Sequence, residues 1–170
     1  TLNKLPKSPD SSRTFVQGGK LKFEYSGTVY AWDEDTDSWA TEGVMTYQYS
    51  KNIFVHNDIA YYLYNNKLYK YENGTDTIVA DVSGITLDTP LVMGNVVYGC
   101  KNPNSSGINT HAQWYCLDLS TYTSRFVGYG PAFRFYNYNV ICMENKIYLI
   151  MGLHGSGYYH NVFIMHEVTE

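Results

Sequence analysis

Residues 15–39, FVQGGKLKFEYSGTVYAWDEDTDSW, carry the pattern from which the fold can be predicted. Apolar residues alternate with polar ones within it, first at Leu21, Phe23 and Tyr25 and again from Val29 onward. Alternation with a period of two is typical of β-strands that bury one face. The Gly and Asp residues between the alternating runs favour tight turns. The stretch therefore predicts several short strands joined by hairpin turns.

A second copy of this stretch lies 39 positions further along the chain, at residues 54–78. The two copies align without a gap, so that Phe15 matches Phe54 and Tyr30 matches Tyr69. A repeat of about 40 residues with several strands in each copy is the pattern of a propeller blade. The sequence therefore predicts an all-β fold, a β-propeller of four-stranded blades.

Two further copies of the repeat are interrupted by insertions. The third copy has its extra loop at residues 101–113, and the fourth has one at residues 153–160. We expect a single domain of residues 1–170 with four blades at these positions: 13–42, 52–82, 89–128 and 138–170.

The fourth copy ends after its third strand. We therefore expect residues 1–5 to supply the outer strand of that blade and to close a four-bladed ring, because closure removes sheet edges that invite aggregation. The alternative is that the chain is part of a larger propeller.

The blade pattern resembles kelch-type repeats. VYAWDEDTDSW at residues 29–39 is similar to the third strand, turn and Trp of such a repeat, and IYLIMG at residues 147–152 is similar to its second strand. The resemblance covers most of the chain and implies kelch-like blades. Kelch-like repeats occur in intracellular adaptors, extracellular enzymes and phage or cell-surface proteins, so the resemblance does not by itself select a function.

The composition is rich in Tyr and poor in charge. The chain has 18 Tyr, 16% charged residues and a net charge of −4, and its 12 basic residues are scattered. Scattered basic residues argue against nucleic-acid binding, and no apolar run reaches the roughly 20 residues that span a bilayer. We interpret the low charge and the abundant Tyr and Asn as typical of an extracellular, cell-surface or virion protein. A cytoplasmic location is the alternative.

Aromatic residues gather in segments that a meander of four strands would place on one face of the propeller. These segments are the two insertions and the connections at 43–50 and 128–138. Loops that carry aromatic residues together with Gly and Asn are typical contact surfaces. The candidate ligand-binding residues on this face are Tyr47, Tyr49, Tyr129, Arg134, Tyr136, Tyr138, His154, Tyr158, Tyr159 and His160.

No metal or cofactor site is predicted. His154 and His160 lack the paired spacing of zinc ligands, and the acidic turn at residues 33–37 lacks the central Gly and final Glu of a calcium loop. Catalytic patterns are also missing, since the sequence contains no Gly-x-Ser-x-Gly elbow and its acids fall mostly in turns. Cys100 and Cys116 are expected on neighbouring strands, either as a disulfide or as buried free thiols.

The sequence thus favours a non-catalytic recognition module. Its aromatic rings would contact a surface glycan or a protein loop, and the chain could belong to a larger assembly. Two alternatives remain open: an intracellular kelch-like adaptor that binds a peptide, and a glycan-processing enzyme.

Overall fold

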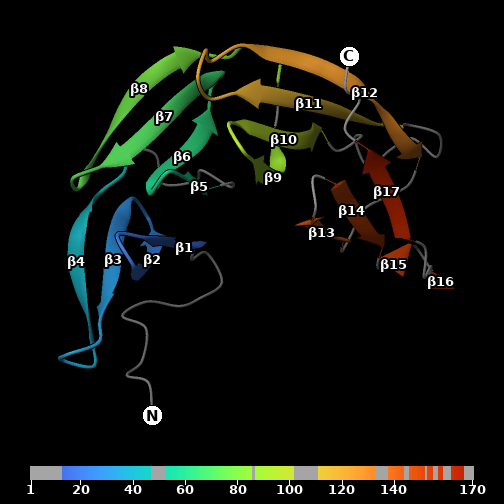
Figure 1. The fold of residues 1–170 in the computed structure, drawn as a ribbon. Helices are drawn as coiled ribbons and strands as arrows, with labels where there is room; N and C mark the ends of the chain where they lie inside the picture. The colour runs from blue at the N-terminus through green and yellow to red at the C-terminus, as the bar shows by residue number, and fades with distance from the viewer. Residues whose placement is uncertain are drawn as a thin grey trace. The chain divides into compact units, whose positions relative to one another are not determined.

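The computed structural model shows a chain built of antiparallel β-strands (Figure 1). The chain divides into two compact units, residues 1–84 and 85–170. All regular secondary structure among the described residues is β-strand. None of these residues forms a helix long and apolar enough to cross a membrane. The structure describes residues 13–46, 53–85, 87–101, 111–132, 138–143, 146–151, 153–154, 157–158 and 162–166.

The first sheet is a meander of four strands, each hydrogen-bonded to the next along the chain. Two of its turns, Gly18-Gly19 and Ser26-Gly27, have positive φ at both central residues. Turns with this geometry match the twist of the strands that they join, and Gly adopts it without strain. The strands are β1 (Arg13–Gln17), β2 (Lys20–Tyr25), β3 (Thr28–Asp33) and β4 (Ser38–Val44).

The second sheet repeats this meander. A shift of 39 positions carries β2 onto β6 and β3 onto β7, which confirms the repeat that the sequence predicts. Its turns use Asn57-Asp58, Asn65-Asn66 and Asn73-Gly74, and all six residues have positive φ. The strands are β5 (Phe54–His56), β6 (Ile59–Tyr64), β7 (Lys67–Glu72) and β8 (Thr75–Asp81).

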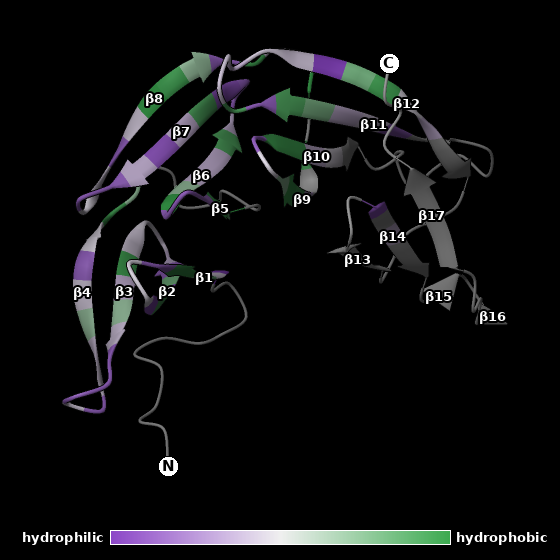
Figure 2. Ribbon diagram, in the orientation of Figure 1, coloured by the Kyte–Doolittle hydropathy of each residue, from purple (hydrophilic) through white to green (hydrophobic). Residues whose placement is uncertain are grey.

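The first two sheets share a core. Hydrophobic and hydrophilic residues alternate along their strands (Figure 2), so each sheet can turn one apolar face toward the other. Burial of a large apolar side chain contributes roughly 1.5–3 kcal/mol, which makes this core the main source of stability in the unit. The buried cluster comprises Phe15, Val29, Met45, Ala60, Tyr62, Tyr69 and Tyr71.

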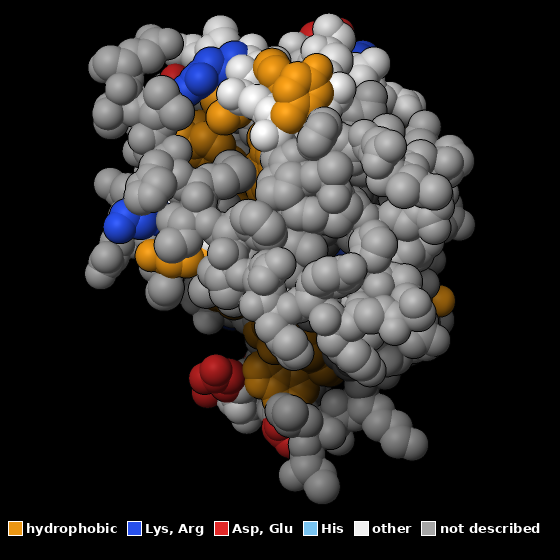
Figure 3. Space-filling view, turned by 90° about the vertical axis from the view of Figure 1, so that its right-hand side faces the viewer, with side chains coloured by type: hydrophobic (Ala, Val, Ile, Leu, Met, Phe, Trp, Pro, Cys, Tyr) orange, Lys and Arg blue, Asp and Glu red, His pale blue; other side chains and the backbone are white. Residues whose placement is uncertain are grey.

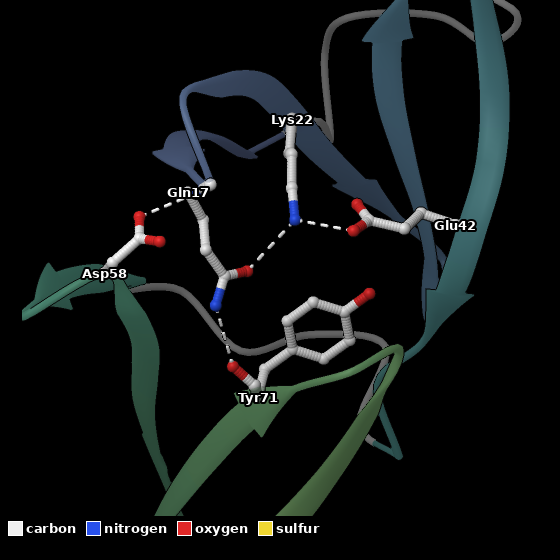
Figure 4. A network of polar contacts seen from close by, with 6 residues as sticks. Gln17, Lys22, Glu42, Asp58 and Tyr71 are labelled. Atoms are coloured by element: carbon white, nitrogen blue, oxygen red, sulfur yellow. Dashed lines mark hydrogen bonds and ion pairs between the residues drawn. The ribbon is translucent and has the colours of Figure 1, made fainter.

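A polar network also joins these two sheets (Figure 4). Lys22 is buried, and its Nζ donates to Oε1 of Glu42 at 2.6 Å and to Oε1 of Gln17 at 3.2 Å. The Gln17 amide in turn donates to the backbone carbonyl of Tyr71 at 3.1 Å, and thus links β1 to β7. Because the buried Lys22 has a carboxylate and an amide as partners, its charge is compensated. The network thus ties β1, β2 and β4 of the first sheet to β7 of the second.

The second unit contains three further sheets. One is a four-stranded meander with strand order β12-β11-β10-β9, another has the order β13-β14-β17, and β15 and β16 form a hairpin. The strands are β9 (Asp88–Met93), β10 (Val96–Lys101), β11 (His111–Asp118), β12 (Ser124–Ala132), β13 (Tyr138–Met143), β14 (Lys146–Met151), β15 (Leu153–His154), β16 (Gly157–Tyr158) and β17 (Val162–His166).

The observed strands test several of the expectations drawn from the sequence. The all-β prediction is confirmed, and the described strands form three antiparallel sheets of four strands and one of three, none of which closes on itself. Residues 1–5, the expected closing strand, lie outside the described residues. Part of the predicted 128–138 connection is wrong, because residues 128–132 belong to β12. The fourth-copy insertion contains a short hairpin, β15–β16.

Cys116 is a buried free thiol, which rules out its disulfide with Cys100. In the β10–β11 ladder, Cys100 lies opposite Trp114 and Cys116 lies opposite Tyr98. The two cysteines are therefore offset by two positions rather than paired across the strands. The free-thiol alternative holds for Cys116.

Candidate binding surface on the third sheet

An irregularity in β12 places two aromatic side chains on the same face of the third sheet. In the β11–β12 ladder, Tyr115 pairs with Phe126 whereas Trp114 pairs with Gly128, so Val127 is an extra residue. Successive side chains of a regular strand point to opposite faces, and a bulge of one residue shifts that alternation. Phe126 and Tyr129 consequently lie on one face.

These two residues form an exposed aromatic surface together with β11. The side chains of Phe126 and Tyr129 are 46% and 67% exposed. Their ring centroids are 5.0 Å apart at an interplanar angle of 67°, and the ring of Tyr115 lies 5.6 Å from that of Phe126 at 66°. Edge-to-face contacts of this kind hold aromatic rings in fixed orientations. We call the set Gln113, Tyr115, Phe126 and Tyr129 the β12 aromatic surface.

Polar groups lie beside the rings of this surface. Gln113 pairs with Tyr129 across the ladder, and its Oε1 accepts a hydrogen bond of 2.9 Å from the hydroxyl of Tyr115. No described residue accepts a hydrogen bond from the amide nitrogen of Gln113. The surface thus combines aromatic faces with a neutral amide donor that a ligand can use. Neutral donors and aromatic faces suit a ligand that carries both apolar patches and hydroxyl or carbonyl groups.

The opposite face of the same sheet has a different chemistry. It is hollowed by a cavity of about 240 Å³ lined by Val96, Tyr98, Cys116, Asp118, Thr123, Ser124 and Arg125. Burial raises the pKa of the Cys116 thiol, and nearby Arg125 only partly offsets that effect. A thiol with a raised pKa is a poor nucleophile at neutral pH.

Of the ten predicted site residues, the structure describes the side chain of Tyr129 alone. Tyr129 lies on β12, and its side chain is exposed. The backbones of Tyr138, His154 and Tyr158 belong to β13, β15 and β16 respectively. The remaining six lie outside the described residues: Tyr47, Tyr49, Arg134, Tyr136, Tyr159 and His160.

Sequence reasoning missed the companions of Tyr129. The sequence patterns do not single out Tyr115 or Phe126, and they place Gln113 at the end of the 101–113 insertion. Their alternation along β11 and β12 is visible in the sequence, but the bulge at Val127 is not, because it depends on how the two strands pair.

The described residues contain no group of three His, Cys, Asp or Glu side chains arranged to hold a metal ion. The side chains of His111 and His154 are not described, and His160 lies outside the described residues. The structure therefore adds no metal ligand set to the candidate surface.

Comparison with known proteins leaves the chain without an assigned family. No protein-family model matches it, and no curated protein is similar to it at a significant level. The resemblance to kelch-type repeats therefore stays a prediction from the sequence.

Proposed function

We propose that this chain is a non-catalytic recognition module that binds a glycan through the β12 aromatic surface. The observation that carries the proposal is the exposed pair of Phe126 and Tyr129, held edge to face beside the Gln113 amide. Sugar rings present C–H groups that stack on aromatic faces and hydroxyls that accept from an amide. A protein loop is the second ligand that such a surface suits, because exposed aromatic residues are also typical of protein contacts.

The architecture that we propose for the module is a β-propeller of four kelch-like blades. Support comes from three four-stranded antiparallel meanders, from the three-stranded antiparallel sheet that follows them, and from the 39-residue register between the first two. In such a ring residues 1–5 would complete the last blade. Connections between the blades would then add Arg134, Tyr136 and the other predicted contact residues to the binding face.

A setting on a virion or cell surface is part of this proposal, with the chain in a larger assembly. Its support is compositional: low charge and 18 Tyr suit a protein whose surface makes polar and aromatic contacts outside the cell.

A glycan array tests the proposal with the 170-residue chain and three variants. Phe126→Ala and Tyr129→Ala each remove one ring, and Ile78→Ala is the control because Ile78 is 53% exposed on the second sheet. We expect a glycan signal that falls at least tenfold in both ring variants and is unchanged in the control. This result would make the chain a glycan-binding module that uses the β12 aromatic surface.

Two other results would count against the proposal. A glycan signal that survives in both ring variants would remove the β12 aromatic surface as the site. If no glycan on the array binds, the proposal that the ligand is a glycan is wrong. The binding of the ring variants to candidate partner proteins would then be compared. A Tyr136→Ala variant in the same array tests the predicted contribution of the 128–138 connection.

A further inference from the structure

The hollow on the third sheet combines a buried floor with an exposed basic rim. Tyr98, Cys116 and Arg125 form one row across β10, β11 and β12, because Cys116 pairs with both of the others in the two ladders. Tyr98 and Cys116 are buried, whereas Arg125 is exposed. Figure 3 shows basic and hydrophobic side chains together at the upper end of the molecule, the height at which β12 lies in Figure 1.

The matching part of the first sheet stays open to solvent. Arg125 corresponds to Ala40, because each pairs with the residue two positions before an aspartate that fixes the following turn. These aspartates, Asp118 and Asp33, both accept hydrogen bonds from the backbone amides two and three positions ahead. Ala40 is exposed, although it lies in one row with Phe15 of the core between the first two sheets. A sheet packed on this face therefore leaves the part that corresponds to the hollow uncovered.

Two opposite charges line the hollow without neutralising each other. Arg125 forms no ion pair with a described carboxylate, and Asp118 forms none with a described basic side chain. Oδ1 of Asp118 accepts from the backbone amides of Ser120 at 2.7 Å and Thr121 at 3.3 Å, whereas Oδ2 accepts from none of the described residues. The hollow thus offers a cation to an anionic group and a carboxylate oxygen to hydrogen-bond donors.

An acidic sugar matches this lining in chemistry and in size. A guanidinium binds a carboxylate through two parallel hydrogen bonds, and sugar hydroxyls can donate to Asp118. The C–H groups of the sugar can pack on the apolar atoms of Val96 and Tyr98. A small carboxylate without hydroxyls would instead bring a second negative charge toward Asp118 with no donor to compensate it.

The volume of the hollow limits the ligand to a small one. It measures about 240 Å³, which is below the roughly 300–1,000 Å³ of pockets for drug-sized molecules. A single sugar ring is therefore a suitable occupant.

We propose that this hollow binds one acidic sugar residue, with the sugar carboxylate on Arg125 and ring hydroxyls on Asp118. The site is separate from the β12 aromatic surface, because it lies on the opposite face of the sheet and selects a charged ligand. Its test therefore succeeds or fails independently of the array with the ring variants.

A chemical-shift titration of the 15N-labelled chain tests the site. Glucuronate and galacturonate are the probes. The methyl ester of each is the matched ligand, since it keeps the ring and its other hydroxyls but carries no charge. We expect at least one of the two acids to cause saturable shifts of the backbone amides at 96–98, 116–118 and 123–125. Added salt should weaken this binding, and the esters should cause no such shifts.

Charge variants identify the two polar groups. Arg125→Gln should weaken binding of the acid about tenfold or more, because it removes the charged donor. Asp118→Asn keeps an oxygen for the turn amides but replaces the other with a donor, and should weaken binding about threefold or more. Lys20→Gln is the control, because Lys20 is an exposed basic residue of the first sheet, and we expect it to bind the acid normally.

Three results would overturn the proposal. The first is that neither acid shifts the amides of the hollow, and the second is that an acid and its ester shift them equally. The third is that Arg125→Gln binds the acid as tightly as the wild type does. Urea unfolding of each variant, followed by circular dichroism, separates a lost site from a lost fold.

Discussion

The rings of Phe126 and Tyr129 lie 5.0 Å apart at an interplanar angle of 67°, although the two residues are three positions apart on one strand. An odd separation would place them on opposite faces of a regular strand. The bulge at Val127 brings them to the same face. The β12 aromatic surface therefore depends on a backbone irregularity as much as on its side chains.

This contact predicts a measurable coupling between the two rings. In a double-mutant cycle with Phe126→Ala and Tyr129→Ala, we expect a coupling free energy of about 0.5–1.5 kcal/mol. A cycle that combines Tyr129→Ala with Arg125→Ala is the control, because Arg125 lines the opposite face of the sheet. Urea unfolding measures both cycles, and equal couplings would contradict the edge-to-face contact.

Gly43 is predicted to tolerate no side chain. A Cβ at this position would lie 2.5 Å from the hydroxyl oxygen of Tyr71 and would also overlap the backbone of Gly74. Because that backbone cannot move aside cheaply, we expect Gly43→Ala to lower the free energy of unfolding by about 2–3 kcal/mol. Gly128→Ala is the control, since its Cβ would meet nothing within 4 Å. If Gly43→Ala lowers the free energy of unfolding by no more than the control does, this close approach is refuted.

Two buried tyrosines of the first core should respond differently to removal of the hydroxyl. The hydroxyl of Tyr71 is buried and has no hydrogen-bond partner among the described residues, whereas that of Tyr62 donates to the Asp76 carboxylate. Burial, with the charges of Glu42 and Asp76, raises the pKa of Tyr71 to about 12.

We therefore expect Tyr71→Phe to leave stability unchanged or to raise it by about 1 kcal/mol. Tyr62→Phe should lower stability by about 1–2 kcal/mol, because the carboxylate loses a donor. Thermal and urea unfolding of the two variants provide the comparison. The reverse order of stabilities would show that the Tyr71 hydroxyl is satisfied in solution.

Glu24 should make stability depend on pH in an unusual direction. Its side chain is fully buried, and burial raises its pKa above the ordinary 4.5 despite hydrogen bonds from Gly27 N at 2.7 Å and Arg13 Nη1 at 2.8 Å. A raised pKa in the folded state means that the stabilising contribution is present below pH 4.5 and is lost as pH rises through the raised pKa.

The measurement compares wild type with Glu24→Gln, which keeps an acceptor for Gly27 but does not titrate. As pH is lowered from neutral toward 4.5, we expect the wild type to gain stability relative to the variant. Subtraction of the two curves cancels the titration of the other carboxylates. A difference that stays constant, or that favours the variant at low pH, would show that the Glu24 pKa is not raised.

Local sequence patterns were sufficient to predict the first strands and their repeat. Alternating apolar residues set β2 and β3, and their counterparts 39 positions later set β6 and β7, because period-two patterning and Gly or Asn turns act locally. The strands and the turn of a single hairpin could thus be predicted from residues that are neighbours in the sequence.

Contacts between side chains of different strands could not be predicted in this way. The bulge at Val127, the free Cys116 opposite Tyr98 and the contact of Gly43 with Tyr71 depend on pairing and packing between segments. The sequence singled out Tyr129, but the strand pairing supplied Phe126 and Tyr115 as its neighbours. Register is a property of two strands together, and no pattern within either strand determines it alone.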